Sequence, residues 1–100
     1  MKRFTVSVLA EAEGDIGEAI RWYRARGPTA ADDFRSEVAE AIDDLADNAG
    51  IWPRDEDGAH RRVLKRFPYT IHHEVANLAV TVLAVAHDRR LPGFWRDDSS

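Results

Sequence analysis

The chain has 100 residues, of which 44% are hydrophobic and 32% charged, with a formal net charge of −4 and a mean hydropathy of −0.46. This composition is typical of one soluble globular domain and excludes collagen-like and intrinsically disordered chains. No apolar run approaches the ~18 residues of a membrane span, acidic residues follow the N-terminus too soon for a signal peptide, and the lack of cysteine excludes disulfides and thiolate ligands. We expect a single cytoplasmic domain over residues 1–96, a polar tail at 97–100, and no membrane contact.

Charge is distributed unevenly along the chain. Residues 1–50 carry a net charge of −5 and residues 51–100 a net charge of +1, and within residues 58–96 the bases exceed the acids by five. This division predicts a basic face on an acidic body, which would steer an acidic partner or a polyanion. Arginine supplies 12 of the 14 bases, which suits bidentate contacts to phosphate or carboxylate and equally fits a compositional bias.

The first half of the chain predicts one strand followed by two helices. Apolar residues alternate over residues 4–8, which indicates a half-buried strand. They then recur at steps of three and four from Leu9 to Tyr23, and again from Phe34 to Leu45, which indicates two amphipathic helices. The Gly27-Pro28 pair breaks the pattern between them, and Thr29 is the expected N-cap of the second helix. We therefore expect an antiparallel helix hairpin.

The second half predicts three strands after a connection without periodicity at residues 47–61. A connection of this length is usually functional or mobile. The expected strands cover residues 62–67, residues 69–75 and residues 79–86, and the last is apolar on both faces, as in a central strand. The expected fold class is α+β in the order β-α-α-β-β-β, an antiparallel-dominated sheet with the helix hairpin packed on one face.

The histidines do not form an obvious metal site. His72 and His73 are adjacent in a predicted strand and point to opposite faces, so they cannot easily share one ion. His73 is expected to face the core with a hydrogen-bond partner. Glycine-rich phosphate loops, nucleophile elbows and HExxH motifs are absent from the sequence. We expect no bound metal and no cofactor, and we assign no catalytic residue.

The end of the last predicted strand carries the most informative polar cluster. Here His87 precedes Arg89 and Arg90, and a rigid strand end holds such side chains in place. One interpretation is a proton donor beside a phosphate clamp, as RNA cleavage requires. The other is that His87 closes the strand, Asp88 pairs with Arg90, and the bases solvate an edge. The candidate target-binding surface comprises Arg61, Arg62, Lys65, Arg66, His87, Arg89 and Arg90.

Two segments together resemble the RelE/ParE toxin superfamily in its ParE-like branch. They are FPYTIHHEV at residues 67–75 and VLAVAHDRRLP at residues 82–92, and scattered matches extend the resemblance over nearly the whole chain. The resemblance implies the toxin half of a toxin–antitoxin pair, held inactive by a cognate antitoxin encoded in the neighbouring reading frame. ParE-like members poison DNA gyrase, whereas RelE-like members cut mRNA on the ribosome.

Departures from the family pattern favour gyrase as the target. RNA-cleaving members usually place a catalytic Tyr or His near the C-terminus, where this chain has Trp95, and His73 stands where members often have Tyr. Ribosome-dependent mRNA cleavage is the alternative, and an interaction module that retains only the toxin fold is a third. The antitoxin is expected to lay an apolar helix along the helix hairpin and acidic residues over the Arg-rich strands. Its expected contacts are Trp22, Tyr23, Phe34 and Trp52.

Overall fold

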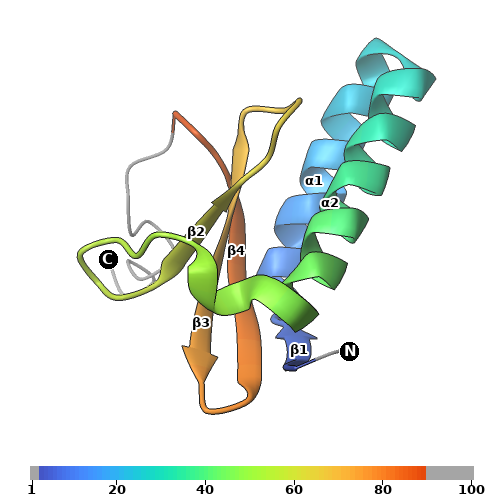
Figure 1. Ribbon diagram of the computed structural model, residues 1–100. Coiled ribbons are helices and arrows are strands. Elements are labelled where there is room, and N and C mark those ends of the chain that lie inside the picture. Colours follow the sequence, from blue (N-terminus) through green and yellow to red (C-terminus); the bar gives the residue numbers. More distant parts are fainter. Residues whose placement is uncertain (1–2, 90–100) are drawn as a thin grey trace.

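The computed structural model describes residues 3–89 and contains two helices, one short 3-10 helix and a four-stranded sheet (Figure 1). The strand order in the sheet is β1-β4-β3-β2, with β1 parallel to β4 and the other neighbours antiparallel. The expected α+β class and element order are confirmed. The elements are β1 (Thr5–Val8), α1 (Ala10–Arg26), α2 (Pro28–Asn48), η1 (Ala49–Ile51), β2 (His60–Val63), β3 (Tyr69–Ala76) and β4 (Ala79–His87).

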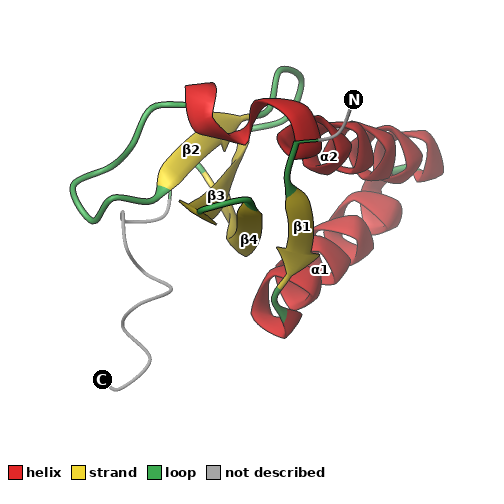
Figure 2. Cartoon of the chain, turned by 60° about the horizontal axis from the view of Figure 1, so that its bottom comes forward, coloured by secondary structure: helices red, strands yellow, loops and turns green. Residues whose placement is uncertain are grey.

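The helix hairpin covers one face of the sheet, and the core lies between the two layers (Figure 2). Phe34 and Leu45 of α2 are fully buried, as are Ile71 of β3 and Val82 of β4. Both helices owe this placement to their apolar stripes, because the opposite faces carry charged side chains that stay in water. The sheet therefore presents its other face away from the helices.

The turn between the helices forms where the sequence predicts it, but the cap differs. α2 begins at Pro28, with Gly27 as its N-cap, and the Gly27 amide donates to the Tyr23 carbonyl at 2.8 Å. The expectation that Thr29 caps the helix is wrong, because Pro28 already occupies the first helical position, where its missing N–H costs nothing. Thr29 therefore lies inside the first turn.

The second strand lies earlier than the sequence pattern suggests. β2 covers His60–Val63 rather than residues 62–67, and the Leu64 amide already donates to the Tyr69 carbonyl at 3.0 Å. The chain thus turns within residues 64–68. The expected strand was too long at its C-terminal end, because the alternation of apolar residues continues into a turn whose amides bind a helix side chain instead of another strand.

A bulge in β4 changes which side chains face the helices. The register between β3 and β4 shifts at His72/His73, so that Leu83 has no partner in β3 and Val85 follows Val82 on the core side. β1 ends at Val8, which leaves the Val85 amide without a strand neighbour. The Asp15 carboxylate of α1 accepts a hydrogen bond from this amide at 3.0 Å. Asp15 therefore replaces the missing strand and holds the last part of β4 in place.

The connection from α2 to β2 is a hydrogen-bonded structure rather than an open loop. The Asp55 carboxylate accepts hydrogen bonds from the backbone amides of Asp57 and Ala59. The turn between these residues has a positive φ of 90° at Gly58, a conformation that glycine adopts readily. The rings of His60 in β2 and His73 in β3 stack with their centroids 5.2 Å apart, and each ring binds a backbone carbonyl of this connection. His60 donates to the Trp52 carbonyl at 2.6 Å and the fully buried His73 donates to the Ala49 carbonyl at 3.0 Å. The expectation of a core-facing, hydrogen-bonded His73 is confirmed.

Candidate functional site

An aromatic groove forms where α1 ends beside the start of β3 and the end of β4. Tyr69 and His87 are register partners, and their rings meet edge to face with centroids 5.2 Å apart. Trp22 and Tyr23 reach them from the end of α1. The hollow has a volume of about 420 Å³ and is lined by Glu18, Trp22, Tyr23, Pro68, Tyr69 and His87. The structure thus brings His87, expected at the target surface, into one groove with two side chains expected to contact the antitoxin.

A cluster of buried rings supports this groove from the core. The Tyr23 ring lies 5.4 Å from that of Phe34 and 5.1 Å from that of Phe67, and burial raises the pKa of the Tyr23 hydroxyl. Phe34 itself is 0% exposed. It therefore holds the groove from beneath and offers a partner no surface of its own in this conformation.

The two tryptophans expected to contact the antitoxin lie far apart along the helix pair. Trp22 is 49% exposed at the end of α1, with the Arg26 guanidinium 3.5 Å from its ring centroid. Trp52 follows the far end of α2, a helix of 21 residues that spans about 30 Å. A partner that contacts both must extend along the length of α2.

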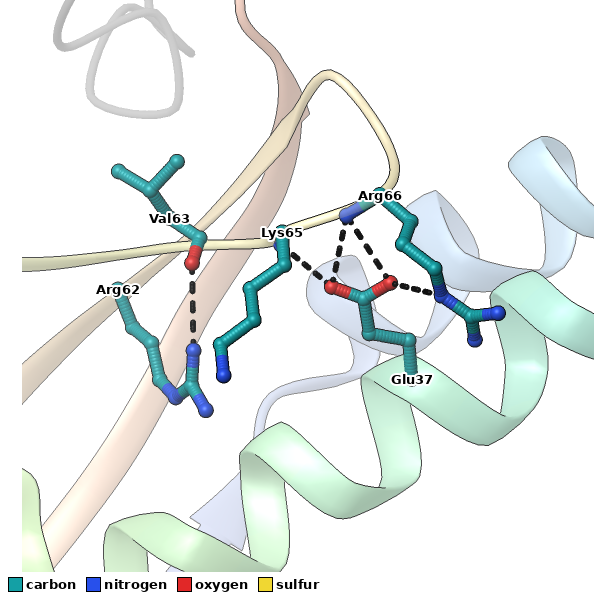
Figure 3. Close-up of polar contacts among 5 residues, drawn as sticks. All are labelled: Glu37, Arg62, Val63, Lys65 and Arg66. Atoms are coloured by element: carbon teal, nitrogen blue, oxygen red, sulfur yellow. Dashed lines mark hydrogen bonds and ion pairs between the residues drawn. The ribbon is translucent and has the colours of Figure 1, made fainter.

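A second hollow, the basic hollow, lies between α2 and the turn at residues 64–68 (Figure 3). The Glu37 carboxylate of α2 accepts hydrogen bonds from the backbone amides of Lys65 and Arg66. It also accepts a hydrogen bond from the Arg66 guanidinium at 3.3 Å. Burial alone would raise the pKa of Glu37, but these amides and the guanidinium outweigh it and lower the pKa below its ordinary value. The volume is about 400 Å³, and the lining residues are Glu37, Glu40, Ala41, Arg62, Lys65 and Arg66.

Arg62 is used inside the protein rather than on its surface. Its side chain is 14% exposed and pairs with Asp44 of α2 at 3.7 Å. Its guanidinium also lies over the Trp52 ring, 4.6 Å from the centroid, and donates to the Val63 carbonyl. Arg62 therefore joins β2 to α2, and a partner would have to displace these contacts to use its charge.

Arg61 and Arg89 are not among the residues that line the basic hollow with Arg62, Lys65 and Arg66. Arg61 is paired in register with His72, on the sheet face turned away from the helices. Arg89 is exposed, and its amide donates to Nδ1 of His87 at 3.2 Å. The Thr70 hydroxyl donates a hydrogen bond to the Asp88 carboxylate at 2.7 Å. Arg90 and the suggested Asp88–Arg90 pair lie outside the described residues.

Glu37→Ala should lower the free energy of unfolding by about 2 kcal/mol, because two turn amides and the Arg66 guanidinium lose their charged acceptor. Urea denaturation at pH 7 measures this loss. Glu40→Ala, on the same helix and hollow, is the matched control and should change stability by less than about 0.5 kcal/mol. Equal losses in the two variants would contradict the assigned role of Glu37.

Within residues 3–89, no group of three His, Cys, Asp or Glu side chains is arranged to hold a metal ion. Over the same residues, neither helix combines the length and the apolar composition needed to cross a bilayer.

Sequence reasoning missed three helix acids that bind distant parts of the chain. Asp15, Glu37 and Asp44 all lie on the polar sides of their helices, where the pattern indicates ordinary solvated carboxylates. Their contacts join residues 18 to 70 positions apart, such as Arg62 to Asp44 and Val85 to Asp15. No local motif in the sequence identifies such pairs.

The element order and the strand order define an α+β domain of the RelE/ParE type. Residues 6–92 match the family model described as the ParE toxin of the type II toxin–antitoxin system, parDE. The chain therefore belongs to the ParE toxin family. A solved structure described as the chromosomal ParDE TA system from P. aeruginosa shares the fold, with a TM-score of 0.76, 18% identity, and coverage of 85% of this chain and 96% of that one. A search of curated proteins gave no match.

Proposed function

We propose that this protein arrests bacterial growth by inhibiting DNA gyrase in the cytoplasm and is neutralised by a cognate antitoxin. Membership of the ParE toxin family over residues 6–92 carries the proposal. Trp95 supports gyrase over mRNA as the target, because RNA-cleaving relatives place a Tyr or His in that region of the sequence. The similar structure from P. aeruginosa is described as a ParDE system, which supports an antitoxin partner for this chain as well.

The proposed target surface consists of exposed bases with His87 beside them. Arg61, Lys65 and Arg89 are exposed and can reach a partner, and Arg90 extends this set in the sequence. Arg62 and Arg66 support the surface through their contacts with Asp44 and Glu37. The proposed antitoxin surface runs from Trp22 and Tyr23 along α2 to Trp52.

Two assays run in parallel test the proposed target. The full-length protein, made by cell-free synthesis, is added to a gyrase supercoiling reaction and to a translating ribosome system with a defined mRNA. We expect inhibition of supercoiling and intact message. Cleavage of the message without an effect on gyrase would replace the proposal with ribosome-dependent RNA cleavage, and silence in both assays would favour a non-toxic interaction module.

Co-expression tests the partner. The protein encoded by the adjacent small reading frame should co-purify with this chain and restore growth. If the two proteins are well folded and elute separately, the antitoxin assignment is wrong.

Arg61→Ala combined with Arg89→Ala should raise the concentration needed to inhibit supercoiling, because each lost charge-assisted bond costs about 1–3 kcal/mol of target binding. Thermal unfolding should hardly change, since both side chains are exposed. Arg24→Ala with Arg35→Ala removes two exposed helix cations and is the matched control. If both double variants inhibit gyrase as well as the parent, these bases are a solvated edge and the target surface lies elsewhere.

A further inference from the structure

The outer face of the sheet, which is turned away from the helices, carries four nearly buried residues (Figure 2). Thr70 and His72 of β3 lie on this face, since Ile71 between them faces the core. Their register partners in β4 are Ala86 and Ala84, which therefore share the face. All four are only 1–8% exposed. Small side chains on an open sheet face remain accessible to water from above, so these exposures indicate a covering layer.

Within residues 3–89, the segments outside the sheet are bound elsewhere. The amides of residues 3–4 donate to the Ala46 carbonyl of α2, and η1 packs against the core on the helix side. Residues 53–54 continue the sheet beside β2, and the turn at residues 64–68 binds Glu37 of α2. These contacts place all four segments at the edges of the sheet or on its helix side. The described elements thus leave the centre of the outer face to another segment.

The chain leaves β4 on this same face. Asp88 follows the strand directly, and the Thr70 hydroxyl donates to its carboxylate at 2.7 Å, which fixes Asp88 at the outer face. The sequence then continues with LPGFW at residues 91–95, which combines a leucine, a proline and two aromatic residues. Residues 96–100 are all polar. An apolar segment therefore begins beside a sheet face that needs a cover.

The length of this segment suits the distance to be covered. Trp95 is six positions after Arg89, and six residues of chain span up to ~20 Å. Ala84 is three positions before His87 in β4, a distance of ~10 Å along a strand, and neighbouring strands lie ~4.8 Å apart. The Trp95 ring can therefore reach the pair of Ala84 and His72. Alanine at this position leaves room for a ring above the sheet.

We propose that residues 91–95 fold back over the outer face of the sheet, with the rings of Phe94 and Trp95 on Ala84 and Ala86. The occupant of this face is then a segment of the same chain. It gives the domain a second, smaller apolar layer on the side opposite the helix hairpin, and the burial of two aromatic rings offsets the loss of chain entropy.

Docking of this segment also bears on the exposed bases. Arg61 lies on the outer face in the edge strand β2, and Arg89 directly precedes the segment, so both border the cover. A partner that contacts both bases must reach across it. This consequence rests on the proposed function, whereas the docking itself is a property of the isolated chain.

Methyl NMR on the full-length protein tests the docking directly. Protein made by cell-free synthesis carries ¹³C-labelled alanine methyl groups, and we expect NOEs from the ring of Phe94 or Trp95 to the methyl groups of Ala84 and Ala86. A mixture of labelled and unlabelled protein separates contacts within one molecule from contacts between two. NOEs seen only between molecules would assign the face to a second copy, and no NOE from either ring would leave it uncovered. Each of these results overturns the proposal.

The titration of His72 gives a second readout. Burial is the main cause that lowers its pKa to about 4; Asp55 and Asp88 oppose this effect, and Arg61 and His73 add to it. In the parent, the ring-proton shifts of His72 should therefore show a neutral ring at pH 5. His73 faces the helices and should keep its lowered pKa in every variant.

Removal of the two aromatic rings should expose His72 to water. In Phe94→Ser with Trp95→Ser, the pKa of His72 should rise from about 4 toward the ordinary histidine value of about 6.5. Ile51→Ser with Leu78→Ser removes two exposed apolar side chains from other segments, and this matched control should leave the pKa of His72 unchanged. An unchanged pKa in the first double variant, or equal rises in both, would overturn the proposal.

Discussion

Phe34→Ala should lower the free energy of unfolding by about 3–5 kcal/mol, the usual cost of removing a buried phenylalanine ring. Phe34 is 0% exposed, and its ring centroid lies 5.4 Å from that of Tyr23, 5.3 Å from Phe67 and 5.0 Å from Tyr69. The cavity would remove the contacts that hold α2 against the groove. Denaturant unfolding of parent and variant measures the loss, and growth arrest should disappear with the folded protein.

The same experiment decides whether Phe34 is a contact residue. Trp22→Ala is the comparison, because Trp22 is 49% exposed and its removal should cost little stability while weakening the antitoxin complex. Phe34→Leu keeps most of the apolar volume and should recover much of the stability. A Phe34→Ala protein that unfolds like the parent but no longer binds the antitoxin would show that Phe34 touches the partner directly.

The architecture could be predicted because its signals are local. Each helix carries its own apolar stripe, and Gly27-Pro28 separates them. Asn77, with a positive φ of 56°, lies in the short connection between the strands expected at residues 69–75 and 79–86. Each of these features depends on residues that are close together in the sequence. The type and order of the elements can therefore be predicted from the sequence alone.

The ends of the strands could not be predicted in the same way. β2 stops at Val63 because Glu37, far away in the sequence, binds the amides of the following turn. Beyond the bulge in β4, the Val85 amide binds the Asp15 carboxylate of α1, 70 positions earlier in the chain. Both are consequences of tertiary contact, which competes with local alternation and here outweighs it.

The basic residues show the limit of charge counting. Five bases of the candidate target surface lie within residues 3–89, and in the sequence they look equivalent. In the structure, Arg62 pairs with Asp44 and Arg66 pairs with Glu37. Arg61 lies on the other face of the sheet. The sequence predicts the amount of charge in this region. Which charges remain available to a partner depends on carboxylates from α2, a segment that pattern analysis assigns to the acidic body.

Acidification should destabilise the protein well before its carboxylates are protonated, because two histidines are buried in the neutral form. Burial is the main cause that lowers the pKa of His72 to about 4; Asp55 and Asp88 oppose this effect, and Arg61 and His73 add to it. Burial also lowers the pKa of His73, against the effect of its hydrogen bond to the Ala49 carbonyl. Both rings therefore stay neutral in the folded protein over a pH range in which the unfolded chain already binds protons.

The sign and the pH range follow from these directions. Below the ordinary histidine pKa of about 6.5 the unfolded chain binds protons that the folded protein refuses, so stability is full above this pH and falls as the pH is lowered. For His72 alone the loss is about 2 kcal/mol at pH 5 and about 3 kcal/mol at pH 4. His73 adds a loss of the same sign. Glu37 contributes at lower pH, because its pKa lies below the ordinary value for a glutamate.

Urea denaturation at pH 7.5 and pH 5 measures this loss directly. His72→Gln removes the ring whose pKa burial lowers to about 4, so the difference in unfolding free energy between the two pH values should shrink by about 2 kcal/mol. Glu40→Gln changes an exposed carboxylate whose side chain faces the basic hollow and should keep the pH difference of the parent. If the parent and His72→Gln lose the same stability between pH 7.5 and pH 5, His72 already carries its proton in the folded protein at pH 5, and burial does not lower its pKa.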